Sequence, residues 1–475
     1  MQEANQTERH WIDRRSSHLL VGVVAAINVA VTVWVSGRLR PIQDDYWHGN
    51  VVGEHGVFGG VLFWWETWAG YVSSCFVAAV LVGWPLVHLP WWIASGVTFL
   101  AVCTLMGVLA VVATGAARPR SRGNRGLVFL LGFTSWVAFV WSGQWWGWGA
   151  NWHMQIMAFG LTHWQTMTAI YVVSWQIVVI SGVWLLQREF GVVKGVPIAL
   201  ALGVFTGATH AMFALGAVLF VVLVGSMSGV AALLGPPERT GRLAVKKQLV
   251  FAGCFVAAAS AAVLLAHASP GQRYRSTLIE PRFPIEAASL WPMVKFVFPY
   301  LFDRLWWVFW HGGSVVVFSG ALGLSLSIGF AQRRQLWGAG LAVVLGLCMF
   351  CGARVGQAFS YEAYYHAVWG YLSVYLAVFL LGWWLGASLR VRVPGGVRAM
   401  GVPLLVGYFL VAASLANREL IQSVNERYDA WYAGSAPIPG VGDVGDAPYW
   451  MQHWQDLQGH RHEVVDRNLP PLETP

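Results

Sequence analysis

Long apolar segments alternate with short polar ones along most of this chain. A helix that crosses a bilayer needs about 20 apolar residues, and about eleven segments approach or exceed that length. The predicted spans are 18–36, 91–114, 127–142, 166–186, 196–208, 211–234, 249–268, 305–328, 336–353, 366–388 and 399–415. Only residues 206–210 separate the fifth from the sixth, so 196–234 could form one span or two. The pattern predicts an all-α polytopic membrane protein.

Composition agrees with this fold class. The chain has 475 residues, of which 57% are hydrophobic and 11% are charged, whereas a soluble domain has about 25% charged residues. Its 29 Trp and 14 Tyr are typical of a protein with aromatic belts at both membrane interfaces. We expect two parts: a transmembrane domain, 1–415, and a small outer tail, 416–475, rich in Pro, Gly and acidic residues.

Basic residues predict the orientation of the spans. Alternate connecting segments are short and carry Lys and Arg, as in 118–125, 239–247 and 390–398, which is typical of the inner face. The chain is therefore predicted to have its N-terminus inside and its C-terminus outside, as a multi-pass protein of the cell membrane. This orientation explains the net charge of +8 without a nucleic-acid partner. The outer segments are the longer ones, so we expect the active site on the outer face.

The first outer loop, 37–90, concentrates ionisable and aromatic side chains. Ionisable groups are costly to hold near lipid and usually serve chemistry or transport there. One interpretation is a general base near the bilayer edge, with aromatic rings that stack on a sugar or bracket a lipid. We predict that the Trp-rich part, including Trp64, forms an amphipathic helix on the outer membrane surface. The alternative is that the acids after Pro41 only cap a helix. The candidates are Asp44, Asp45, Trp47, His48, Glu66 and Trp68.

Two other outer loops carry further candidates. In segment 143–155, Trp148 and His153 combine flat aromatic faces with a polar edge, which suits carbohydrate; the alternative is an interfacial aromatic belt. In segment 269–283, Arg273 and Arg275 are outer cations whose guanidinium groups match phosphate oxygens. Gly271 would allow the backbone to approach a ligand closely. The alternative for these arginines is pairing with nearby acids or lipid head groups.

Arg354, at the end of the ninth predicted span, is either a snorkelling anchor or a further phosphate ligand. Several His residues lie on the predicted outer side, but no metal-binding spacing such as H-E-x-x-H occurs. Cys348 and Cys351 form a C-x-x-C inside an apolar span, where small packing residues are expected. A metal site stays open from spacing alone.

Several short motifs resemble a known family. They are Asp44-Asp45-Tyr46 after the first span, the W-x-G-Y sequence at 68–71, the Trp-rich segment 146–152 and the S-P-G-x-x-x-R sequence at 269–275. Together with eleven spans, they resemble the GT-C-type membrane glycosyltransferases. The chain departs from the family pattern at three places: Tyr71 stands where Arg is common, Gln272 replaces Asn, and Tyr428-Asp429 lacks the closing Arg.

The resemblance implies a sugar donor linked to polyprenyl phosphate and a glycan or lipid acceptor in the cell envelope. It implies an inverting transfer in which Asp44 or Asp45 acts as the general base and the arginines hold the leaving phosphate. Some relatives bind a divalent metal near the acids and others require no cofactor; His48 and Glu66 would be the first additional ligands.

Two other functions remain as alternatives. A transporter or flippase of lipid-linked saccharides would share the arginines and aromatics. It would be expected to show internal repeats or a buried coupling charge, and the sequence has neither. A membrane acyl- or phosphotransferase is the third; an acyltransferase needs a His deep in a span, whereas His210 and His311 lie near predicted span ends.

Overall fold

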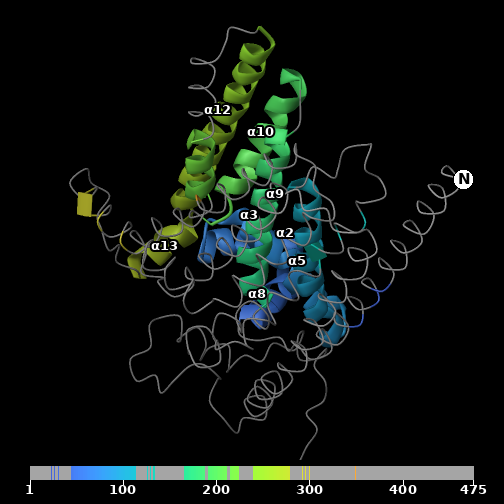
Figure 1. Ribbon diagram of the computed structural model, residues 1–475. Coiled ribbons are helices and arrows are strands. Elements are labelled where there is room, and N and C mark those ends of the chain that lie inside the picture. The colour runs from blue at the N-terminus through green and yellow to red at the C-terminus, as the bar shows by residue number, and fades with distance from the viewer. Residues whose placement is uncertain are drawn as a thin grey trace, which may run out of the picture.

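The computed structural model describes residues 44–113, 165–187, 191–210, 214–223 and 239–278, together with isolated positions 23, 26, 30, 126, 129, 132–133, 291–292, 295, 299 and 348. Within this part of the chain the fold is helical and contains no β-strand, as the all-α prediction expects (Figure 1). The elements are α2 (Asp44–Thr67), α3 (Val72–Ala78), η1 (Ala79–Gly83), α4 (Trp84–His88), α5 (Trp91–Ala113), α8 (Gln165–Met167), η4 (Thr168–Val173), α9 (Ser174–Gln187), α10 (Val192–Gly207), α12 (Arg239–Ala268) and α13 (Pro270–Leu278).

Helices α10 and α12 lie side by side (Figure 1). They approach closely because small, buried residues recur at every fourth position of α10, on one face of the helix. These residues are Gly195, Ala199, Gly203 and Gly207. Near the start of α10, Gly195 faces the ring of Phe251, and at its end Gly207 faces the backbone of Ala259. The two helices are therefore parallel.

The parallel direction of α10 and α12 constrains the path of the chain between them. Helix α10 ends at Gly207, where the backbone N–H of Thr209 donates a hydrogen bond to the carbonyl of Thr206. The chain between Gly207 and Arg239 therefore connects the end of one helix to the beginning of a parallel one. The number of membrane spans in 196–234 stays a prediction.

A second packed group joins α5 to α9 and the preceding turns. The buried side-chain amide of Gln176 in α9 donates a hydrogen bond to the carbonyl of Val102 in α5, at 3.1 Å. One turn earlier in α5, the hydroxyl of Thr98 donates to the carbonyl of Leu81 in η1, at 3.0 Å. These bonds connect α5 to both neighbours.

The first outer loop is predicted at 37–90, and its described part is a compact helical unit. Helix α2 is followed by a continuous apolar helix, α3–η1–α4, that includes one π-helical segment. The two pack through a shared core formed by Val51, Val52, Val61, Trp64, Cys75 and Ala79. Gly83 permits this contact: a Cβ there would lie 2.8 Å from the carbonyl oxygen of His48.

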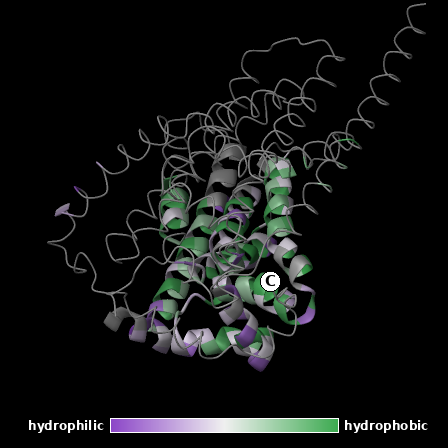
Figure 2. Ribbon diagram, turned by 90° about the horizontal axis from the view of Figure 1, so that it is seen from below, coloured by the Kyte–Doolittle hydropathy of each residue, from purple (hydrophilic) through white to green (hydrophobic). Residues whose placement is uncertain are grey.

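Among the described residues, one helical stretch is long and apolar enough to cross a membrane. It is Leu249–Ala268 within α12, which has 20 residues and a mean hydropathy of 2.4. Shorter apolar stretches include Val72–His88, Gly96–Val112 and Val192–Gly207. Most of the described ribbon is hydrophobic, and most hydrophilic positions lie near the lower edge of Figure 2. The eleven-span arrangement stays a prediction.

Candidate functional site

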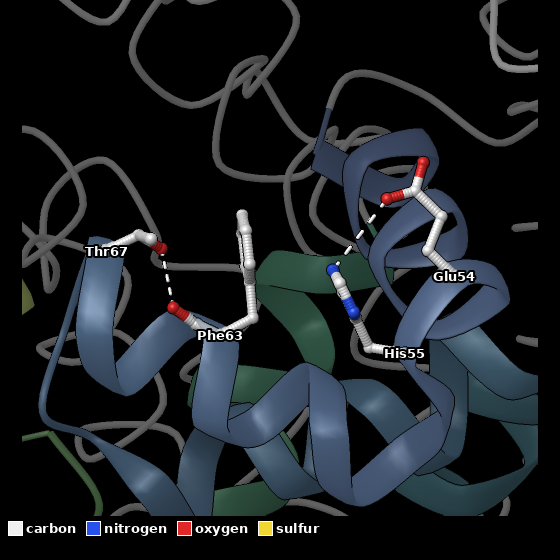
Figure 3. Close-up of polar contacts among 4 residues, drawn as sticks. All are labelled: Glu54, His55, Phe63 and Thr67. Atoms are coloured by element: carbon white, nitrogen blue, oxygen red, sulfur yellow. Dashed lines mark hydrogen bonds and ion pairs between the residues drawn. The ribbon is translucent and has the colours of Figure 1, made fainter.

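Helix α2 is a hairpin rather than a straight helix. Gly56 has φ 69° and ψ 176°, which breaks the helix into two arms. That combination of angles is almost exclusive to glycine, because a Cβ would clash with the backbone. The arms fold back on each other, so His55 of the first arm stacks on Phe63 of the second, with ring centroids 5.3 Å apart (Figure 3).

The contacts near the turn are weak and exposed. The Nε2 atom of His55 lies 3.8 Å from a carboxylate oxygen of Glu54, and both side chains are exposed (Figure 3). The hydroxyl of Thr67 donates to the carbonyl of Phe63 at 2.6 Å, which ties the last turn of the second arm (Figure 3). Exposed ion pairs contribute little to stability, so packing between the arms holds the hairpin.

The candidate acid Asp45 lies in the first turn of α2 and is 0% exposed. Its Oδ1 atom accepts two hydrogen bonds from Thr166 in α8, one from the backbone N–H and one from the hydroxyl, both at 2.7 Å. Thr166 is also buried and is 121 residues away along the chain. These bonds fix the Asp45 carboxylate against the start of the α8–η4–α9 helix. Asp44 is the first residue of α2.

Aromatic side chains from both arms of α2 form one cluster. The ring of Trp47 meets those of Trp64 and Trp68 edge to face, with centroids 6.1 Å and 5.9 Å apart. His48 lies against Trp64, with ring centroids 4.1 Å apart. Edge-to-face pairs of this kind contribute beyond their buried area. The predicted candidates Trp47, His48 and Trp68 are thus brought together, and Trp64 lies at their centre.

Trp64 faces the interior of this helical unit. The membrane-surface helix stays a prediction, and within it the side chain of Trp64 is only 1% exposed. The outward side of this arm instead presents Phe58 and Leu62, which are 76% and 62% exposed. Trp64 points inward because Trp47 and His48 lie opposite it on the first arm of α2.

Burial determines the charge of His48. It lowers the pKa of the imidazole from 6.5 to about 3, because a cation would lose its hydration there. His48 is therefore neutral near pH 7. Its Nδ1 atom and the Nε1 atom of Trp64 have no hydrogen-bond partner among the described residues.

The segment predicted as the third outer loop begins with a helix, α13. Ser269 is buried, and its hydroxyl oxygen accepts a hydrogen bond from the backbone N–H of Gln272 at 3.1 Å. Pro270 occupies the first helical position, where its missing N–H has no cost. The sequence S-P-G-Q is thus a helix-capping motif. Both Arg273 and Arg275 belong to α13, and the Arg273 side chain is exposed.

The end of α2 meets the start of α13. A Cβ on Gly271 would overlap the backbone nitrogen of Trp68, so Gly271 allows helix-to-backbone contact. This corrects the expectation that Gly271 serves a ligand. A Cβ on Gly70 would likewise overlap the carbonyl oxygen of Ala266 in α12. The aromatic cluster and the arginine-bearing helix therefore adjoin each other.

Tyr71 occupies the position where the resembling family has Arg, and the structure gives it a packing role. Its ring stacks on that of His210, with centroids 4.6 Å apart, and Tyr171 contacts the same histidine at 5.5 Å. The next turn is anchored nearby, because the N–H of Ser73 donates to the carbonyl of Ala208 at 2.9 Å. Sequence reasoning missed both Thr166 and this use of His210, because their partners are far away in the sequence.

Of the remaining candidates, some lie within the described residues and others lie outside them. Glu66 is exposed, whereas His48 is buried, and the described residues contain no group of three His, Cys, Asp or Glu side chains that could hold a metal ion. Trp148, His153 and Arg354 lie outside the described residues, as does the tail 416–475.

The described site therefore combines a fixed acidic turn, an aromatic cluster and an adjoining helix with two arginines. These groups are suited to accepting a proton, stacking on a flat ligand face and binding an anion. Comparison of the chain with protein-family models, with curated proteins and with solved structures gave no match.

Proposed function

We propose that this protein is a membrane glycosyltransferase of the GT-C type. It moves a sugar from a polyprenyl-phosphate donor to a cell-envelope glycan or lipid acceptor on the outer side of the cell membrane. The observation that carries the proposal is the contact between α2 and α13 at Trp68 and Gly271. This contact brings the helix with the acids and aromatic rings beside the helix that bears Arg273 and Arg275.

The exposed apolar surface supports a membrane location. Only 28% of Leu249–Ala268 is buried, whereas the core helix of a soluble protein would be mostly buried. Leu264 and Leu265 near its end are exposed, as are Phe58 and Leu62 on α2. Exposed apolar side chains on a helix of this length are typical of contact with lipid.

The contacts also support the proposed orientation. Six predicted outer positions form three contacts between segments that are far apart in sequence. Asp45 bonds to Thr166, and Gly70 contacts Ala266. Beside them, Ser73 bonds to Ala208. The charge pattern assigns all of these positions to the outer ends of spans or to outer loops. A topology with the opposite assignment for one of them would separate residues that are in contact.

The proposed reaction is a single inverting displacement. A carboxylate at Asp44 or Asp45 takes the proton of the acceptor hydroxyl, and that oxygen attacks the anomeric carbon. The bond between the anomeric carbon and the phosphate oxygen breaks, and polyprenyl phosphate leaves with the electron pair. Arg273 and Arg275 stabilise the charge that develops on the phosphate, and Arg354 is a further candidate. No external oxidant or nucleotide is needed.

The aromatic cluster would hold the sugar or the acceptor. Trp47 and Trp68 are half-buried and can offer ring faces to a sugar, while His48 supplies a neutral polar edge. We place Trp148, His153 and Glu66 in the same binding role from the sequence. The proposal holds with or without a divalent metal.

A transfer assay tests the proposal. Purified protein in lipid vesicles would receive radiolabelled polyprenyl-phosphate sugars and cell-envelope acceptors. We expect label to move to the acceptor, and we expect the variant that removes the general base, either Asp44→Asn or Asp45→Asn, to lower the rate by about 10²–10⁴-fold. Glu54→Gln is the matched control, because it neutralises an exposed carboxylate on the same helix. If both aspartate variants keep full activity, the base assignment is wrong; if label only crosses the bilayer, the protein is a flippase.

A further inference from the structure

The two neighbouring acids of α2 have different structural positions. Asp45 is fully buried, and Oδ1 of its carboxylate is occupied by both donors of Thr166. In this arrangement Asp45 has no contact with solvent through which an acceptor hydroxyl could reach it. Its two bonds require only an oxygen that accepts hydrogen bonds, and not a group that changes its protonation state.

The Asp45 bonds join two elements that otherwise touch little. One donor is the backbone N–H of Thr166, in the first described turn of the α8–η4–α9 helix. The bonds therefore fix both the position and the rotation of the first turn of α2.

Asp44 lies one residue earlier, at the start of α2. It is the other acid that the sequence offers as a general base, and the burial of Asp45 leaves it as the candidate. We propose that Asp45 is a positioning residue which, through Thr166, holds the first turn of α2 so that Asp44 serves as the general base. This inference rests on the proposed glycosyl transfer and divides its roles between the two acids.

Isosteric variants separate the two roles in the transfer assay. Asp44→Asn should lose about 10²–10⁴-fold in kcat, the usual contribution of a general base. Asp45→Asn keeps an oxygen that can accept both bonds from Thr166, so its kcat should fall by no more than about tenfold. The opposite result, with Asp45→Asn inactive and Asp44→Asn active, would overturn the proposal.

Thr166 supplies the matched control pair. Thr166→Val removes the hydroxyl donor but retains the backbone N–H, whereas Thr166→Ser retains both donors. We expect Thr166→Val to lower kcat with little change in KM, and Thr166→Ser to restore it. If Thr166→Val keeps the full wild-type kcat, the positioning role is wrong.

The pH dependence of kcat/KM distinguishes the general base from a positioning residue, because only loss of the base removes the titrating group. Asp45→Asn should retain the acidic limb of kcat/KM, because the titrating base is still present, and a loss of that limb would contradict the proposal.

Thermal unfolding of Asp45→Ala, Thr166→Val and the double variant measures the coupling energy between Asp45 and Thr166 without an activity assay. A measurable coupling is expected, and additive losses would overturn the positioning role. If the wild type transfers no sugar while the coupling is present, the proposed function fails and the structural bond stands.

Discussion

Gly203 of α10 lies directly against the backbone of α12: a Cβ at Gly203 would be 2.5 Å from the carbonyl oxygen of Phe255. A real Cβ is essentially never that close to an oxygen, and a backbone atom within a helix cannot move aside as a flexible side chain can. The parallel pair α10–α12 therefore depends on the absence of side chains along one face of α10.

Gly203→Ala should weaken this pair. The added methyl group forces the helices apart, and overpacking of this kind typically costs about 1–3 kcal/mol. The measurement is thermal unfolding in detergent. Gly253→Ala is the matched control, because Gly253 lies in α12 with open space around its Cβ position. An equal loss in both variants would mean that close packing at Gly203 is unimportant.

The hairpin of α2 gives a second prediction. Gly56→Ala should destabilise the protein by about 1–3 kcal/mol, because alanine is strained at this combination of φ and ψ. Nothing lies within 4 Å of the Cβ position, so the effect isolates backbone strain from crowding. Denaturant unfolding measures it, with Gly253→Ala again as the control. A neutral Gly56→Ala would show that the hairpin turn is not formed.

His48 predicts a dependence of stability on pH. Its pKa is about 3 in the folded protein and 6.5 when unfolded, so below pH 6.5 the unfolded chain binds a proton that the folded protein does not. Stability from this group is complete above pH 6.5 and is lost as the pH falls toward 3, by up to about 1.4 kcal/mol per pH unit. His48→Phe should flatten this dependence in unfolding measurements. His88→Asn, which changes an exposed histidine, should leave it unaltered.

The exposed side of the second α2 arm should contact lipid. In single-cysteine variants, a spin label at Leu62 should collide often with oxygen and rarely with a water-soluble nickel complex. A label at Glu54, an exposed position on the first arm of α2, should show the reverse. Phe58 contacts Phe76 of α3, so a label at Phe76 should resemble Leu62. A Leu62 label that is more accessible to the nickel complex would place this face in water.

The main features of the fold were visible in the sequence because they depend on composition and local pattern. Long apolar segments predicted helices within 91–114, 166–186, 196–208 and 249–268, where the structure has α5, α9, α10 and α12. The apolar helix Val72–His88 was instead predicted as part of an outer loop. Basic segments predicted an orientation, which stays a prediction. The grouping of Trp47, His48 and Trp68 was also predictable, since all three belong to one short segment. Ser269 and Gln272 carry a local capping signal that would have identified α13 as a helix.

Other features depended on partners that are distant along the chain. No spacing rule links Asp45 to Thr166, 121 residues away, and only their contact distinguishes Asp45 from Asp44. The inward direction of Trp64 follows from the turn at Gly56, which a helical pattern does not reveal. The sequence by itself determined a helical, apolar chain with an acid- and Trp-rich first loop. The tertiary structure decided which side chains are buried, because burial depends on what another segment places opposite them.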